Sequence, residues 1–448
     1  MYDTSRVRDA LALGLSMKAA PGAAVHICGD DDAVTLVGGE RQAGKGEGLT
    51  SETAFPIGCL SKLLISILCM QLSCEGSLDL DRRVVELLPE LDSGCEYRGT
   101  LTVRHLLAHA GGFLDPPEKN FRWACSWPRY TEFMAENPNV LEPGLVWSYS
   151  QTGHCILARI VERILDLTIE QAIRERIFAP LGIAPVKDKP SCAPPHVFIV
   201  RREKFEAIRM LVDNGILSDS ISPTCLRVTD IAKIGLLMLG ETCGAPNLLP
   251  AEYRDAMLTT IIKPASVSGG PRAEVLPDGY GLGIGRFSGS WGHNGSYLGT
   301  TISLRVAPAV RRVAVVALNA WNFQFRDHLT KLALVCGPAG LSEPDPEPAS
   351  EPPSMGVTDV EPGVYQGLMM GSGCVVVKPD GDCIFKRARE ETPARLVFKD
   401  GRQTIQSAGG ALTGGFISDP SGGKPILRLG ASCYVLVHGD ADHVSRFR

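Results

Sequence analysis

The chain has 448 residues, of which 44% are hydrophobic and 21% are charged, with a formal net charge of −5. This length is too great for one compact core and predicts two or three domains. The charges form no long run of one sign, so the sequence lacks the basic surface that is typical of proteins that bind nucleic acid or an anionic membrane.

The fourteen cysteines are scattered and form no C-x-x-C pair, which disfavours zinc-finger and redox motifs. Charged residues between Asp3 and Lys18 interrupt the apolar run that a secretory signal needs. We therefore expect a cytoplasmic protein with reduced thiols. The most apolar stretch, residues 63–70, is too short to span a bilayer.

The first elements alternate between helix and strand. Apolar positions over residues 5–17 predict an amphipathic helix that ends at Pro21-Gly22. Residues 23–28 and 33–37 predict two strands joined by a hairpin turn. The following Gly39-x-x-x-x-Gly44-Lys45 lacks the Ser or Thr and the apolar helix of a phosphate-binding loop, so we expect no nucleotide site there.

A cysteine and a lysine stand three residues apart at the start of a strongly apolar helix, in the sequence Cys59-Leu60-Ser61-Lys62. On a helix this spacing places the two side chains on one face, about 5–6 Å apart at Cβ. The amine can then accept the thiol proton or stabilise the thiolate, and a helix N-terminus adds partial positive charge. The alternative is a buried, inert Cys59 beside a solvated Lys62.

Residues 101–109 predict another helix, which carries His105 and His109 four residues apart. No acidic or thiol residue follows at a spacing that would complete a metal site. We interpret both histidines as hydrogen-bonding groups at a helix end, and we expect neither a metal nor a cofactor.

Residues 113–133 are rich in aromatic side chains, which stand among prolines and charged residues. An aromatic loop of this length is typical of a pocket wall or lid, although packing inside the fold is the alternative. Trp123 and Trp127 are therefore candidates for a wall beside the substrate.

The remainder of the chain predicts helices, then strands, then a separate β domain. Helices are expected over residues 155–165, 169–178, 204–213 and 228–239, and strands over 280–287, 301–306 and 312–318. His293-Asn294-Gly295 falls in the connection between the first two of these strands. The order predicts one sheet built from both ends of a segment, with a helical layer inserted. A proline-rich linker precedes short β runs over residues 363–437.

Three windows now stand in one order along the chain: Cys59-x-x-Lys62, Tyr149-Ser150-Gln151 and His293-Asn294-Gly295. Their order resembles the S-x-x-K, Y-x-N and K-T-G or H-x-G motifs of the penicillin-recognising serine enzymes, in the branch of class C β-lactamases, D-aminopeptidases and esterases. The resemblance covers about residues 5–335. Two positions differ, because Cys59 replaces the family's serine and Gln151 replaces its asparagine.

The resemblance implies a mixed α/β (α+β) fold, a β-lactamase-like antiparallel sheet flanked by helices. The expected domains are a catalytic domain over residues 1–340, a proline-rich linker over 341–358 and a small barrel-like β domain over 359–448. Within the catalytic domain, we expect the sheet from about residues 20–57 and 280–320, and the helical region over about 75–240.

The resemblance also implies the roles of the site residues. Cys59 would attack an acyl carbonyl, with Lys62 and Tyr149 sharing the proton transfer. The backbone N–H groups of Cys59 and Ser296 would form the oxyanion hole. From the residues alone, Tyr149 is also compatible with a buried aromatic, and His293 with a turn histidine. The further substrate-binding candidates are Gln151, His293, Asn294 and Gly295.

A cysteine nucleophile changes the expected chemistry. A thiol is a far stronger acid than a serine hydroxyl, so less base strength is needed, and the acyl-enzyme is a thioester. We therefore expect transfer of an acyl group from an activated ester or thioester donor, such as a carrier-bound thioester, to an amine, alcohol or thiol. A hydrolase (esterase, thioesterase or amidase) acting through the same acyl-enzyme and an inactive ligand-binding homologue are the alternatives. The expected partner is a small acyl substrate, with no nucleic acid and no membrane, and the oligomeric state is left open.

Overall fold

A computed structural model describes residues 2–29, 32–92, 99–113, 127–136, 141–186, 191–199, 204–207, 224–240, 248–264, 277–297 and 299–336, together with eight strands between residues 363 and 438. The chain forms two compact units. One consists of Met1–Asp79, Ala158–Thr260 and Gly281–Asp345, and the other of Leu80–Leu157, Ile261–Tyr280 and Pro346–Arg448.

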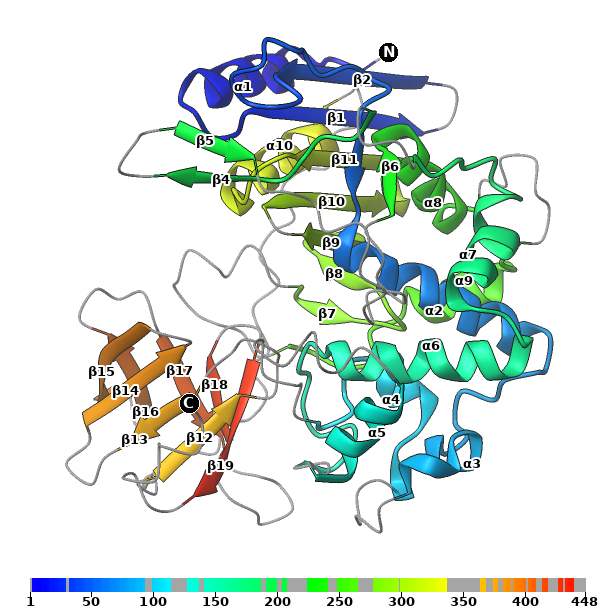
Figure 1. Ribbon diagram of the computed structural model, residues 1–448, viewed down its shortest axis with the longest axis vertical. Helices are drawn as coiled ribbons and strands as arrows, with labels where there is room; N and C mark the ends of the chain where they lie inside the picture. Colours follow the sequence, from blue (N-terminus) through cyan, green and yellow to red (C-terminus); the bar gives the residue numbers. More distant parts are fainter. Residues whose placement is uncertain are drawn as a thin grey trace. The chain divides into compact units, whose positions relative to one another are not determined.

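Six antiparallel strands of the first unit form a sheet in the order β2-β1-β11-β10-β9-β8 (Figure 1). Strand β1 pairs with β11, with Ala23 opposite Leu318, so the two ends of a long segment meet in one sheet as predicted. The strands are β1 (Gly22–Gly29), β2 (Asp32–Gly39), β8 (Gly285–Phe287), β9 (Ser290–Tyr297), β10 (Thr300–Ala307) and β11 (Arg312–Leu318).

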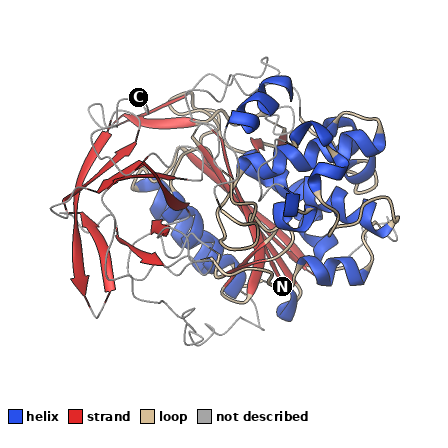
Figure 2. Ribbon diagram, turned by 90° about the horizontal axis from the view of Figure 1, so that it is seen from below, coloured by secondary structure: helices blue, strands red, loops and turns tan. Residues whose placement is uncertain are grey.

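Helices cover both faces of this sheet. Ala314 and Val316 of β11 share a core with Leu329 of α10 (Phe323–Val335), and α1 (Ser5–Ser16) joins the same core. Gly235 of α8 (Val228–Met238) lies against the side chain of Val313, which points to the opposite face because side chains alternate along a strand. In Figure 2 the sheet appears in red with helices in blue beside it.

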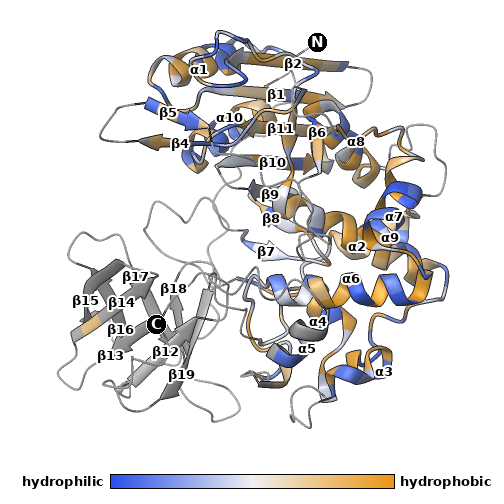
Figure 3. Cartoon of the chain, in the orientation of Figure 1, coloured by the Kyte–Doolittle hydropathy of each residue, from blue (hydrophilic) through white to orange (hydrophobic). Residues whose placement is uncertain are grey.

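Burial on both faces explains the composition of the central strands. Every residue of β1 and of β11 is buried, and Figure 3 shows both strands largely in the hydrophobic colours. The predicted antiparallel sheet flanked by helices is therefore confirmed. Among the described residues, no helix is both long and apolar enough to cross a bilayer.

One predicted helix of the first unit is wrong where it can be compared. Lys204–Ala207 forms strand β5, which pairs with β4 (His196–Ile199), and the rings of Phe198 and Phe205 meet across the pair at 5.0 Å. The four residues alternate polar and apolar, which suits a strand paired along one edge. Residues 208–213 of that prediction lie outside the described part of the chain.

The other elements of the first unit surround the sheet. They are β3 (Ala54–Pro56), the 3-10 turn η1 (Gly58–Leu60), α2 (Ser61–Cys74), α7 (Ile169–Ile173), the π-helical turn η5 (Arg174–Phe178), β6 (Cys225–Arg227), α9 (Ala251–Met257) and η9 (Pro308–Val310). Strand β3 pairs with β6 and leads directly into η1 and α2.

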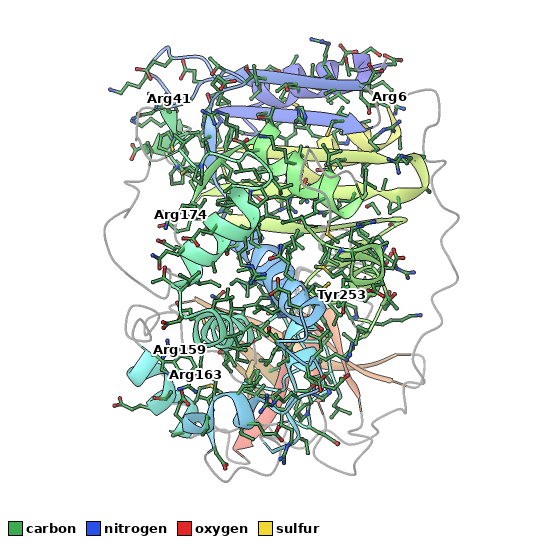
Figure 4. All side chains as sticks on the ribbon, turned by 90° about the vertical axis from the view of Figure 1, so that its right-hand side faces the viewer. Arg6, Arg41, Arg159, Arg163, Arg174 and Tyr253 are labelled. Atoms are coloured by element: carbon green, nitrogen blue, oxygen red, sulfur yellow. The ribbon has the colours of Figure 1, made fainter. Side chains whose placement is uncertain are left out.

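Outside its C-terminal strands, the second unit consists mainly of helices. Its elements are α3 (Val84–Leu87), η2 (Pro89–Leu91), α4 (Val103–Leu107), α5 (Trp127–Glu136) and β7 (Gly279–Tyr280), and α6 (Gln151–Leu165) begins in it. Helix α4 begins at Val103 and not at residue 101 as predicted, because Thr102 and His105 form a capping box at its start, and it ends at Leu107. Helix α6 buries Ile156 and Ile160 and carries Arg159 and Arg163 outside this apolar stripe (Figure 4).

The C-terminal strands close into a barrel in sequence order, with β12 pairing with β19. Closure leaves no unpaired sheet edge. The strands are β12 (Gly363–Gly367), β13 (Cys374–Val377), β14 (Asp382–Arg387), β15 (Glu390–Lys399), β16 (Arg402–Ser407), β17 (Thr413–Ile417), β18 (Ile426–Leu429) and β19 (Ser432–His438). The predicted linker, residues 341–358, lies outside the described residues, and the predicted domain boundaries stay a prediction.

Candidate active site

Cys59 is the one accessible residue in a long buried stretch. From Thr53 to Leu72 every residue is buried except Cys59, which is partly exposed. It lies in the 3-10 turn η1, two residues before Ser61 begins α2, rather than in the first turn of the helix as predicted. Lys62, the second residue of α2, is fully buried. The fold thus leaves the thiol partly exposed and buries the amine.

Two glycines allow the turn that carries Cys59 to touch strand β9. Gly58 has φ +50°, and a Cβ there would lie 2.3 Å from the carbonyl oxygen of Ser296. A Cβ on Gly295 would lie 2.1 Å from the carbonyl oxygen of Ile57. The first and third sequence windows therefore lie in direct backbone contact. His293-Asn294-Gly295 is part of strand β9 and not of a connection, which corrects the sequence prediction.

The pairing of β9 with β10 decides which side chains face the turn. His293 is opposite Leu304 and Asn294 is opposite Ser303. Ser303 Oγ lies 2.5 Å from Thr330 Oγ1 of α10, so Asn294 belongs to the face that α10 covers. Gly295 and His293 belong to the other face, where Gly295 meets Ile57. Of these candidates, Asn294 is therefore the one whose side chain lies on the face of the sheet away from the turn.

His293 is a neutral imidazole in this setting. Its Nδ1 lies 2.7 Å from the carbonyl oxygen of Asn294, which can only accept, so Nδ1 carries the proton and Nε2 is an acceptor. Burial, and secondly the positive charge of Lys62, lower the pKa of His293 to about 3. The buried Lys62 therefore has a neutral and not a cationic neighbour on β9.

A buried arginine supports the strand at Gly295 and Ser296. Arg326 of α10, 1% exposed, donates through Nη1 to Thr301 Oγ1 at 2.7 Å and through Nε to Asp327 Oδ1 at 2.8 Å. Thr301 Oγ1 in turn donates to the carbonyl oxygen of Gly295 at 3.3 Å and lies 3.4 Å from Ser296 Oγ. Helix α10 thereby fixes the segment of β9 that meets the turn of Cys59.

Tyr149 and Gln151 belong to the second unit, at the start of α6. Ser150 caps this helix, because its Oγ accepts from the N–H of Gly153 at 3.0 Å. Gln151 is the first helical residue, and its Nε2 donates to Cys155 Sγ at 3.7 Å. Tyr149 therefore stands one residue before a helix cap.

His109 contacts the segment that carries Tyr149, which the sequence did not indicate. Its carbonyl oxygen accepts from the N–H of Ser148 at 2.9 Å, and its Nδ1 accepts from the N–H of Ser150 at 3.1 Å. The ring centroids of His109 and Tyr149 are 4.4 Å apart. The predicted hydrogen-bonding role of His109 is confirmed, but the spacing to His105 gave no sign that its partner lies 41 residues further along the chain.

Of the two tryptophan candidates, the structure describes only Trp127. Trp127 begins helix α5, so this part of the expected aromatic loop is helical, and its Nε1 donates to Glu90 Oε1 at 3.1 Å. Trp123 lies outside the described residues.

Accessibility separates Cys59 from most other described cysteines. Cys59 is partly exposed and Cys74 is exposed, whereas the remaining described cysteines are buried. Burial raises the pKa of the Cys69 thiol to about 12, so that thiol stays protonated and inert.

Comparisons with known proteins agree with this architecture. A family model described as Beta-lactamase matches residues 7–185. Penicillin-binding protein 4 of Amycolatopsis lactamdurans is 27% identical over 388 residues, which cover 77% of this chain and 94% of that protein. Monacolin J acid methylbutanoyltransferase of Aspergillus terreus is 32% identical over 157 residues, covering 30% of this chain and 38% of that protein.

The crystal structure of SurE superposes with a TM-score of 0.74 at 25% identity, over 96% of this chain and 98% of that chain. The matched domain contains Cys59 and Lys62 in the order that the resemblance required. Residues 7–185 thus match the Beta-lactamase family model, and the chain as a whole is similar to a penicillin-binding protein.

Proposed function

We propose that the protein is an acyltransferase that works through a thioester on Cys59. The observation that carries the proposal is the exposure of Cys59 in an otherwise buried stretch, with Lys62 buried three residues later. A nucleophile must reach its substrate, whereas its proton acceptor works best when water is excluded. The transferase relative named above supports acyl transfer as the reaction class.

In the proposed first step, the Cys59 sulfur forms a bond to the acyl carbonyl carbon of an activated ester or thioester. The thiol proton passes to Tyr149, or to Lys62 when its amine is uncharged, and the developing oxyanion is stabilised by the N–H groups of Cys59 and Ser296. The bond to the leaving group then breaks, and the leaving group takes up the proton. The backbone contact between Gly58 and Ser296 supports this assignment, because it holds the two peptide segments together.

In the second step, an amine, alcohol or thiol attacks the thioester and loses its proton to the same base. Cys59 leaves as a thiolate, which is a better leaving group than the alkoxide of a serine enzyme. Gln151 and His293 are the proposed substrate-contacting side chains, and His293 contributes a neutral hydrogen-bond acceptor.

Intact-protein mass spectrometry tests the acyl-enzyme. The protein is incubated with a panel of acyl thioesters and activated esters, beside Cys59→Ala and the matched control Cys74→Ser, which removes the other described accessible thiol. We expect one acyl increment in the wild type and in Cys74→Ser, and none in Cys59→Ala.

An adduct that persists in Cys59→Ala would contradict the proposal. A complete lack of adducts, with Cys59 alkylated no faster than the other cysteines, would favour the inactive homologue. Transfer and hydrolysis are separated by adding an amine, an alcohol or a thiol acceptor and analysing the products. Release by water alone would replace the transferase with a hydrolase.

A further inference from the structure

The backbone N–H groups of the two residues on either side of Tyr149 donate to the same residue. The N–H of Ser148 donates to the carbonyl oxygen of His109 at 2.9 Å, and the N–H of Ser150 donates to His109 Nδ1 at 3.1 Å. Two hydrogen bonds from residues on either side of Tyr149 fix the direction in which its Cα–Cβ bond leaves the chain. His109 therefore constrains Tyr149 through the backbone, and this constraint is independent of the contact between their rings.

The ring of His109 then packs against Tyr149 itself. Their centroids are 4.4 Å apart with the planes inclined by 38°. Further rings surround His109, with His154 at 4.6 Å and Tyr280 at 5.0 Å. His109 is only 2% exposed, so its ring has little room for another orientation.

The backbone of His109 also departs from the ordinary conformation. Its φ of +55° lies in the left-handed region, which a residue other than glycine adopts only where the surrounding contacts enforce it. Because Nδ1 accepts from an amide, it cannot hold a proton, and a neutral ring must carry its proton on Nε2. This one residue thus combines an enforced backbone turn, a fixed tautomer and a ring contact.

We infer that His109 is a positioning residue that sets the orientation of the Tyr149 phenol for proton transfer. The inference rests on the proposed function, in which Tyr149 shares the proton transfer with Lys62. Proton transfer requires donor and acceptor within hydrogen-bond reach, so a displacement of about 1 Å can cost up to about 100-fold in rate. His109 would act through kcat and leave substrate affinity nearly unchanged.

A double-mutant cycle tests this inference. His109→Phe keeps a ring but removes the acceptor, whereas His109→Asn offers an amide oxygen near the position of Nδ1 and tolerates a left-handed backbone. We expect His109→Phe to lower kcat about 10- to 100-fold with KM within about twofold, and His109→Asn to recover most of that loss. In a Tyr149→Phe background, His109→Phe should lower kcat by less than about threefold, because the group it positions is gone.

Additive losses would overturn the inference, as would an unchanged kcat in His109→Phe. If that variant does not fold, His109→Gln replaces it, since its longer amide misses the Nδ1 position. A Tyr149→Phe enzyme at the wild-type rate would instead refute the proton role of Tyr149 in the proposed function. Amide hydrogen exchange at Ser150 then decides the positioning role, because its N–H loses the Nδ1 acceptor in His109→Phe. Exchange at Ser150 that is no faster in this variant than in the wild type would refute it.

Discussion

Gly58 allows the turn that carries Cys59 to contact the backbone of Ser296, because a Cβ at this position would collide with the Ser296 carbonyl group. Its φ of +50° turns the chain out of β3, and the missing side chain leaves room for the carbonyl group of Ser296. The turn can therefore lie against β9 while the next residue reaches the surface. This contact places the two peptide groups of the proposed oxyanion hole in neighbouring segments.

Gly58→Ala should damage the site more than a comparable change elsewhere. The matched control is Gly76→Ala, because Gly76 also has a positive φ, +72°, but a Cβ added there would meet nothing within 4 Å. Urea unfolding should show a loss of about 1 kcal/mol for Gly76→Ala, from backbone strain alone. Gly58→Ala should lose about 1–3 kcal/mol more, from overpacking against Ser296. Gly58→Ala should also slow the alkylation or acylation of Cys59. If the two variants lose the same stability and their Cys59 is modified at the same rate, the contact between Gly58 and Ser296 is refuted.

The neutral state of His293 makes stability depend on pH. Burial first, and the charge of Lys62 second, lower its pKa from 6.5 to about 3. Between these two pH values His293 is protonated in the unfolded chain and neutral in the folded chain. This contribution to stability is fully present above about pH 6.5 and is lost as pH falls towards 3, with a slope of about 1.4 kcal/mol per pH unit for one proton. His293→Gln should reduce the slope of the unfolding free energy in that window.

His26 provides the control for this titration. Burial lowers its pKa to about 4, and its Nδ1 lies 2.8 Å from Thr35 Oγ1 on the hairpin of β1 and β2. His26→Gln should reduce the acid slope as well, but it should leave the acylation of Cys59 unchanged. A His293→Gln slope equal to that of the wild type would show that His293 is not held neutral by the fold.

At the scale of elements, helix α10 stabilises strand β9 through the hydroxyl group of Thr301. Thr301 accepts from the buried Arg326 and donates to the Gly295 carbonyl, so it joins the helix to β9. Thr301→Val keeps the shape but leaves Arg326 without this acceptor, which should cost about 1–3 kcal/mol. Because Gly295 and Ser296 lose a support, acylation of Cys59 should also slow.

Ser303→Ala is the matched control on the same strand. Ser303 contacts Thr330 of α10 on the same face of β10, and it makes no described hydrogen bond from its side chain to β9. We expect Ser303→Ala to change stability without changing the acylation rate. Equal rates for Thr301→Val and the wild type would refute the support of β9 by α10.

The same elements show what the sequence could predict. Apolar periodicity located α1, α6 and α8 and the central strands β1, β10 and β11, because these elements bury a continuous face or stripe. It failed for β5 and β9, since their conformation is decided by a paired neighbour or by glycine contacts with a segment distant in sequence. The role of His109 was also hidden, because hydrogen bonds across 41 residues leave no local pattern.

At the scale of the whole molecule, the main sheet is built from distant parts of the chain. The sheet joins β1 and β2 to strands that follow almost 300 residues later, a long-range pairing that the order strands, helices, strands predicted. The site candidates were predicted from three short windows, and the structure brings the first and third together inside one unit. The roles of Tyr149 and Gln151 and the nature of the acyl group stay proposals.

The identity of the bond between enzyme and acyl group tests the central claim most directly. The acylated wild type and acylated Cys59→Ser are treated with neutral hydroxylamine and followed by peptide mass spectrometry, because this amine cleaves thioesters much faster than oxygen esters. The account predicts an adduct on the peptide that contains Cys59, lost rapidly from the wild type and slowly from Cys59→Ser. An adduct on another residue, or a wild-type adduct that resists hydroxylamine as the serine variant does, would contradict it.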